Sequence, residues 1–200
     1  MKPFFLFICI LFLISCKKEN GDVLPVLSYH IINGEKKNYK IDNFSFVNQY
    51  GKIVTPKNTL GKVHTFNFFF TSCPSICPPM KLKQLNLAEE FKNYKDFQQF
   101  SITIDLKRDS IEKLQYYSEI SGINHQQWNL LRAKNETDLQ KMAQLLKTNF
   151  KPNEDGTDFY HSSYLALLDK QQQIRGFYDI LSDSELSLLK KDITILLSEE

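Results

Sequence analysis

The chain has 200 residues and carries 25 basic and 23 acidic side chains, which gives a formal net charge of +2. This near balance excludes the strongly basic surface by which proteins bind nucleic acid, so we expect no nucleic-acid partner. The length suits one domain with its own hydrophobic core, and no internal repeat or low-complexity tract divides it.

The first fifteen residues, MKPFFLFICILFLIS, join one lysine to an uninterrupted apolar run, which is typical of a secretory signal. The run is too short for a membrane-spanning helix, which needs about 20 apolar residues. Leu13-Ile14-Ser15-Cys16 resembles the lipobox of bacterial lipoproteins, in which the cysteine is acylated. The resemblance implies a signal peptide over residues 1–15, a lipidated Cys16 and a membrane lipoprotein in the bacterial cell envelope that faces the periplasm. An ordinary signal with a chance cysteine is the alternative.

Residues 16–39 are polar and irregular and are expected to form a tether, with some β character near residues 27–32. The predicted domain occupies residues 40–200. It begins with a hairpin made of residues 44–47 and 53–55, because the connection between them is rich in turn formers. Residues 63–70, VHTFNFFF, are almost wholly apolar, which fits a central strand buried on both faces.

Strands and helices alternate through the rest of the chain. The predicted strands cover residues 100–104, 128–131, 164–168 and 174–178. Four helices are expected, and their signals are an apolar face of Leu82, Leu85, Ala88 and Phe91, a cap at Asp109 with Glu112 and a stop at Gly122, a cap at Thr137 with Gln140, and a cap at Ser182 with Glu185. This alternation predicts an α/β fold with a central mixed sheet flanked by helices.

Two cysteines, Cys73 and Cys77, lie between the central strand and the first of these helices. Cys9 is expected to leave with the signal and Cys16 to carry lipid, so this pair holds the only thiols of the folded domain. An oxidising compartment permits a disulfide between them, but such a short loop constrains little of the unfolded chain. Redox chemistry or metal binding explains the pair better than stapling does, and position alone does not decide between the two.

The residues after the cysteines predict how the second thiol is placed. Pro78 and Pro79 suit a first helical turn, so Cys77 is expected near a helix N-terminus. The unpaired amides and the dipole there favour an anion, which predicts a lowered pKa for the Cys77 thiol. The end of a central strand is also where open α/β sheets bind their ligands.

Three segments carry a resemblance to a known family: FFFTSCPSICPPM (68–80), ITIDLKRDS (102–110) and FYHSSYLALLDKQQQIRGFYD (159–179). Together they resemble the Sco/SenC family, thioredoxin-fold proteins that deliver copper to respiratory oxidases. The resemblance covers residues 44–197 and implies a monomer with one copper ion bound by Cys73, Cys77 and His161. It also implies delivery to the dinuclear copper (CuA) centre of cytochrome c oxidase, with the copper-bearing subunit or another copper chaperone as partner.

The sequence departs from the family pattern beside these ligands. Tyr160 precedes His161 where an acidic residue is common, and Asp158 lies two places earlier. Asp105 is followed by leucine where proline is usual. Asp105, Asp158 and Tyr160 are therefore the candidates for side chains that support the ligands and tune the affinity for metal.

Other interpretations of the same residues stay open. Zinc would need a fourth ligand, for which Met80 and Asp105 are the available side chains. His30, His64 and His125 lack support from the family pattern and are expected to be structural or exposed to solvent. The alternative function is a thiol-disulfide oxidoreductase in which Cys73 and Cys77 form a disulfide when oxidised. Metal and disulfide exclude each other, so redox state would gate copper loading.

Overall fold

The computed structural model describes residues 23–124, 126–154 and 159–199. The predicted signal segment and the residues Cys16, His125 and Asp158 lie outside these ranges. Across the described ranges, no helix is both long enough and apolar enough to span a bilayer.

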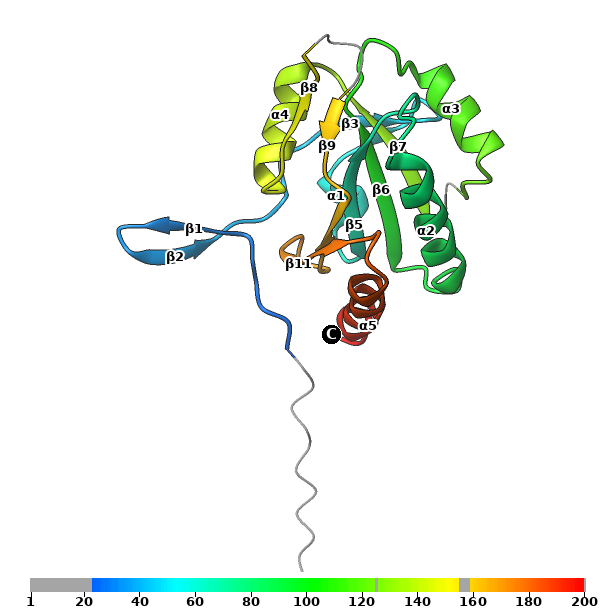
Figure 1. Ribbon diagram of the computed structural model, residues 1–200. Coiled ribbons are helices and arrows are strands. Elements are labelled where there is room, and N and C mark those ends of the chain that lie inside the picture. The colour runs from blue at the N-terminus through cyan, green and yellow to red at the C-terminus, as the bar shows by residue number, and fades with distance from the viewer. Residues whose placement is uncertain (1–22, 125, 155–158, 200) are drawn as a thin grey trace, which may run out of the picture.

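A seven-stranded mixed sheet forms the centre of the molecule (Figure 1). In chain order its strands are β3 (Phe46–Asn48), β4 (Ile53–Val54), β5 (Val63–Phe69), β6 (Phe97–Thr103), β7 (Trp128–Ala133), β10 (Tyr164–Leu168) and β11 (Ile174–Asp179). Their order across the sheet is β11-β10-β5-β6-β7-β3-β4. The pairs β5–β6 and β6–β7 are parallel, whereas the other neighbours are antiparallel. The predicted mixed sheet, the hairpin at residues 44–55 and the fully buried strand β5 are confirmed.

The remaining elements are helices and two small hairpins. The helices are α1 (Pro56–Thr59), α2 (Cys77–Glu90), α3 (Ile111–Ile120), α4 (Glu136–Leu145) and α5 (Asp183–Ser198), and the hairpins pair β1 (Tyr29–Ile32) with β2 (Glu35–Asn38) and β8 (Phe150–Pro152) with β9 (Phe159–His161). One core cluster packs α2 and α5 against the sheet. A larger cluster joins α3 and α4 to the sheet and contains the two cysteines. The dithiol is therefore embedded in the principal core.

Two predicted caps are wrong by one or two residues. Helix α3 is capped by Ser110, whose hydroxyl accepts the backbone N–H of Lys113, because the Asp109 carboxylate is turned into the interior. Helix α4 is capped by Asn135 rather than Thr137. The cap at Ser182 and the stop at Gly122, whose φ is +68°, are confirmed.

The predicted apolar face of α2 is also partly wrong. Leu82 is 59% exposed, and the buried face follows Met80, Gln84, Leu87 and Ala88 instead. A strict three-residue step drifts away from one face of a helix with 3.6 residues per turn. Gln84 lies on the buried face although it is polar, because its amide donates to Asn67 and Ser101 beneath the helix.

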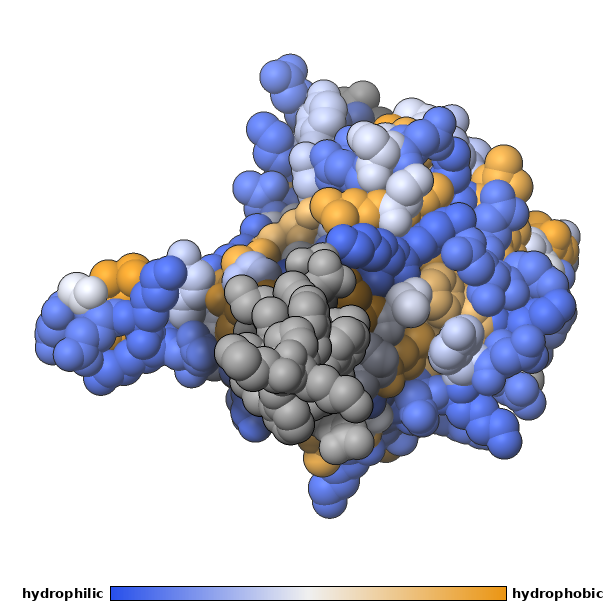
Figure 2. Space-filling view, turned by 90° about the horizontal axis from the view of Figure 1, so that it is seen from below, coloured by the Kyte–Doolittle hydropathy of each residue, from blue (hydrophilic) through white to orange (hydrophobic). Residues whose placement is uncertain are grey.

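The hairpin β1–β2 projects from the body at the side of the molecule (Figure 1). Its base is fixed, since the Tyr39 hydroxyl donates to the backbone oxygen of Leu145 at 2.8 Å. From below, the arm is mostly hydrophilic with an apolar patch (Figure 2), and its exposed apolar side chains are Ile31 and Ile32. The β character predicted near residues 27–32 is confirmed, and the hairpin continues to residue 38, within the segment expected to be a tether.

The parallel pairing of β5 and β6 decides where the chemistry lies. The register aligns Phe69 with Thr103, so the two strands end at the same edge of the sheet. The segment that follows β5 carries Cys73, and the segment that follows β6 carries Asp105 and Asp109. Loops at the carboxyl ends of parallel strands are the usual binding edge of an α/β sheet.

Candidate metal centre

The two cysteines are fixed by the junction between β5 and α2. Cys77 is the first residue of α2, and Pro78 follows in the first turn as the sequence predicts. Cys73 lies in the preceding loop, where its N–H donates to the Phe70 oxygen at 3.3 Å. Both are free thiols and both are buried, with 8% and 5% exposure. The core therefore fixes both sulfur atoms.

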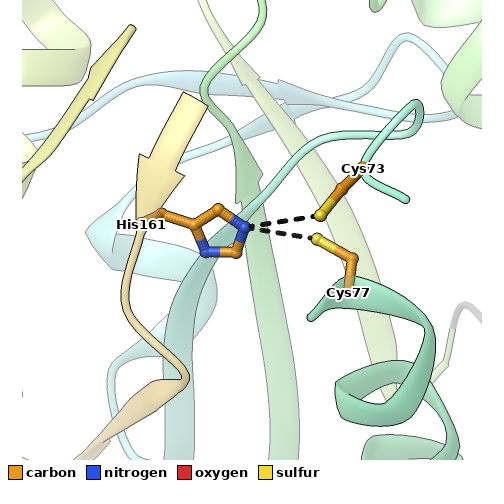
Figure 3. Close-up of side chains that lie close together, drawn as sticks. All are labelled: Cys73, Cys77 and His161. Atoms are coloured by element: carbon orange, nitrogen blue, oxygen red, sulfur yellow. Dashed lines mark hydrogen bonds between the residues drawn. The ribbon is translucent and has the colours of Figure 1, made fainter. Parts of the chain in front are cut away.

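His161 reaches the sulfurs from the short hairpin β8–β9, whose last residue it is. Its Nε2 lies 3.4 Å from the Cys77 sulfur and 4.0 Å from the Cys73 sulfur (Figure 3). Its Nδ1 lies 3.1 Å from the Ser162 carbonyl oxygen, an acceptor for an Nδ1–H. That contact favours the tautomer in which the Nε2 lone pair is directed at the sulfurs.

Aromatic packing holds the imidazole in this orientation. The ring of the buried Phe70 meets the His161 ring edge to face, with centroids 5.7 Å apart. Phe70 also packs on Phe159 of the same hairpin, at 5.4 Å. Since Phe70 directly follows β5, it links the cysteine loop to the histidine hairpin.

The donor atoms of Cys73, Cys77 and His161 all lie within 4.8 Å of one another. The sequence places these residues as much as 88 positions apart, and the fold brings them to one point. Two sulfurs and one imidazole nitrogen form a soft donor set of the kind that suits copper.

The pKa values of the two thiols diverge, and the prediction for Cys77 is wrong. Burial raises the pKa of Cys77 well above its ordinary value, and the negative charges of Cys73 and Asp109 add to this effect. Burial also opposes ionisation of Cys73, but hydrogen bonds from the backbone of Cys77 and Ser75 outweigh it and lower the Cys73 pKa. The removal of the Cys77 sulfur from water is the largest cause of the rise in its pKa, although Cys77 begins α2.

The other candidate residues that the structure describes have surroundings of their own. Asp105 is buried and accepts from the Arg108 backbone and guanidinium, so its carboxylate is already engaged. Tyr160 is 60% exposed, and Lys151 lies over its ring. Met80 is buried in the core beside α5. Asp158 lies outside the described residues.

The remaining described histidines match the structural interpretation. His64 is fully buried among Phe66 and Phe100, where burial lowers its pKa to about 4. His30 is exposed in the projecting hairpin and stacks on Tyr39. Neither belongs to the group of donor atoms at the dithiol.

The sequence did not predict that Asp109 holds the loop that carries Cys73. Asp109 was expected to cap a helix, yet its carboxylate is fully buried and accepts hydrogen bonds from Thr71, two residues before Cys73. The available signal was its position after a strand parallel to the one that leads to Cys73. Phe70 was likewise predicted only as part of a strand.

The fold and the site together define a thioredoxin-like protein with a buried dithiol facing an imidazole. Residues 33–194 match the family model described as SCO1/SenC, and the chain therefore belongs to the SCO1/SenC family. A SCO2-like protein of Rickettsia typhi is 32% identical over 166 residues, covering 78% of each chain.

Solved structures of similar proteins agree with this assignment. A SCO1/SenC family lipoprotein from Bacillus anthracis superposes with a TM-score of 0.72 at 25% identity, covering 86% of this chain and 96% of that one. Arabidopsis thaliana ScoI with copper bound superposes with a TM-score of 0.64 at 26% identity, covering 76% and 96%. The predicted thioredoxin-like fold is thus confirmed.

Proposed function

We propose that this protein binds one copper ion through Cys73, Cys77 and His161 and delivers it to the dinuclear copper centre of a cytochrome c oxidase. The observation that carries the proposal is the position of the His161 Nε2, 3.4 Å and 4.0 Å from the two sulfurs. Copper is the cargo of this reaction. The Sco family is described as one of cytochrome c oxidase assembly proteins.

The donor set fits copper better than the alternatives. Thiolates favour Cu(I), and imidazole binds both Cu(I) and Cu(II), so one site accepts either oxidation state. A structural zinc site would require a fourth ligand, but Asp105 does not belong to the group of donor atoms and pairs with Arg108, and Met80 is packed in the core. A three-ligand site leaves a coordination position through which an acceptor protein can take the ion.

Redox state would control loading. The two thiols are free, and a disulfide between Cys73 and Cys77 would consume both sulfur ligands. The lowered pKa of Cys73 also suits thiol-disulfide exchange, which favours a thiol-disulfide oxidoreductase as the second candidate function. The imidazole directed at both sulfurs completes a group of three metal donors, so we favour copper delivery.

We further propose that the domain is held at the membrane, on its periplasmic side, by a lipid on Cys16. The apolar run before Cys16 and the Leu-Ile-Ser-Cys sequence support this proposal. The similar Bacillus anthracis protein is described as a lipoprotein. The expected partner is the copper-bearing oxidase subunit or another copper chaperone.

Copper titration tests the proposal. Reduced protein should bind one equivalent of Cu(I), and prior oxidation to the disulfide should abolish binding. A protein that binds no copper when reduced, yet reduces a disulfide substrate with turnover dependent on both cysteines, would establish the oxidoreductase instead.

A further inference from the structure

We propose that Asp109 and Lys113 form a clamp that positions the Cys73 thiol for metal binding. The two residues lie one turn apart at the start of α3, and the Lys113 ammonium is 3.6 Å from the Asp109 carboxylate. They are positioning residues, since both act on the two residues that precede Cys73. The inference rests on the proposed copper site, and its test is designed to separate the two.

Asp109 holds the first of these residues. Its carboxylate accepts the backbone N–H of Thr71 at 3.0 Å and also the Thr71 hydroxyl. The Thr103 hydroxyl, at the end of β6, donates to the same carboxylate. A single buried side chain therefore ties the cysteine loop to the neighbouring strand through charge-assisted hydrogen bonds.

Lys113 holds the second residue. Its ammonium donates to the Ser72 hydroxyl at 3.1 Å while it pairs with Asp109. Ser72 is bonded directly to Cys73, so the clamp ends one residue before the sulfur ligand. The Arg132 side chain fixes the clamp from β7, because its Nε donates to the Asp109 backbone oxygen at 3.0 Å.

A contribution to stability alone does not explain why the Asp109 carboxylate is buried. Burial of an ion carries a desolvation penalty of several kcal/mol, so buried ion pairs are a weak source of net stability. Capping does not require Asp109 either, since Ser110 caps α3. What the carboxylate does provide is a fixed position for Thr71, and hence for Cys73 relative to Cys77 and His161.

The test compares two lysines in the full-length protein. Lys113→Met removes the ion pair with Asp109 and the contact to Ser72. Lys83→Met is the matched control, because Lys83 lies on α2, pairs with Asp183 at 2.6 Å and is similarly exposed, at 31% against 40% for Lys113. Thr71→Val and Asp109→Asn remove other contacts of the same clamp.

Two readouts are measured, one with metal and one without. Loss of residues that orient metal ligands typically weakens metal binding by roughly 10- to 100-fold, so Lys113→Met, Thr71→Val and Asp109→Asn should lower Cu(I) affinity in a chelator competition by about 10-fold or more. In the same variants, Cys73 of the metal-free reduced protein should be alkylated about 10-fold faster, since the loop that carries Cys73 should open more often. Lys83→Met should change neither value.

The outcomes are distinguishable. Folded clamp variants with wild-type copper affinity and wild-type alkylation rates would overturn the clamp, even if they melt at a lower temperature. If Asp109→Asn does not fold, Lys113→Met and Thr71→Val carry the test, because they leave the buried carboxylate in place. If the wild-type protein binds no copper, the proposed function fails, and the alkylation rate alone decides whether the clamp exists.

Discussion

The two sides of the candidate metal centre are built very differently. Cys73 and Cys77 are held by the junction between a seven-residue strand, buried along its whole length, and a fourteen-residue helix. His161 ends a three-residue strand that, within the described ranges, pairs with the three-residue strand β8 alone. The sulfur side belongs to the principal core, whereas the imidazole side is a short hairpin that is partly exposed.

This difference suits a protein that has to release its metal. On the proposed function, the two sulfurs on the rigid frame would provide most of the binding, and the nitrogen on the small hairpin would be the ligand to withdraw with least disturbance to the core. Phe70 connects the two sides, because its ring contacts both Phe159 and His161. Four predictions test whether the two sides contribute unequally.

The largest effect is expected on the sulfur side. Cys77→Ser removes one of the two sulfur donors, so bound Cu(I) should fall from one equivalent to none in a chelator competition. Circular dichroism and urea unfolding of the variant provide the control for folding. Retention of a full equivalent of copper would show that the dithiol is not the binding site.

Removal of the Phe70 ring, which links the two sides, should destabilise the protein. Phe70 is 1% exposed, and truncation of a buried phenylalanine to alanine typically costs about 3–5 kcal/mol. Phe70→Ala should therefore lower the free energy of unfolding in urea by about that amount. It should also increase hydrogen exchange in β9 more than in α2. Equal increases in both elements would contradict the idea that the hairpin is the less firmly held side.

Acid should weaken the core at the end of β5 that lies opposite the cysteine loop. Burial lowers the pKa of His64, in β5, to about 4, against an unfolded value of about 6.5. The neutral ring therefore stabilises the fold fully above pH 6.5, and roughly 3 kcal/mol of this stabilisation should be lost as the pH falls from 6.5 to 4. Urea unfolding at several pH values should show this loss in the wild type and not in His64→Gln. Parallel pH profiles would exclude the effect.

The smallest effect is expected on the imidazole side. His161→Ala leaves both sulfurs in place, so Cu(I) binding should persist while Cu(II) affinity falls by about 100-fold, or about 2.7 kcal/mol. Tyr160→Phe, which alters the exposed neighbouring side chain, is the matched control and should leave both affinities unchanged. Visible absorption of the Cu(II) form would detect the change. A larger loss of Cu(I) affinity than in Cys77→Ser would reverse the proposed ranking of the two sides.

Much of the fold could be predicted because its signals are local. The apolar run at residues 63–70 and the Ser182 cap each need only a few neighbouring residues to be recognised, and both are confirmed. The approach of His161 to the dithiol was predicted through the family resemblance, since no local pattern relates residues so far apart in the chain.

The misses share a physical cause, because each depends on tertiary surroundings. Asp109 looked like a helix cap because aspartate favours that position, but Thr71 and Thr103 engage its carboxylate in the interior. Cys77 was expected to ionise readily at a helix N-terminus, but its burial depends on the packing of distant segments and raises its pKa. The position of Cys77 at a helix N-terminus follows from neighbouring residues, whereas the exclusion of water from its sulfur depends on the folded structure.

X-ray absorption at the copper edge of the reduced, copper-loaded protein tests the central claim most directly. The account predicts two sulfur neighbours and one nitrogen neighbour around the ion, with the nitrogen lost in His161→Ala and the sulfurs retained. A copper ion surrounded only by nitrogen and oxygen in the wild-type protein would contradict it.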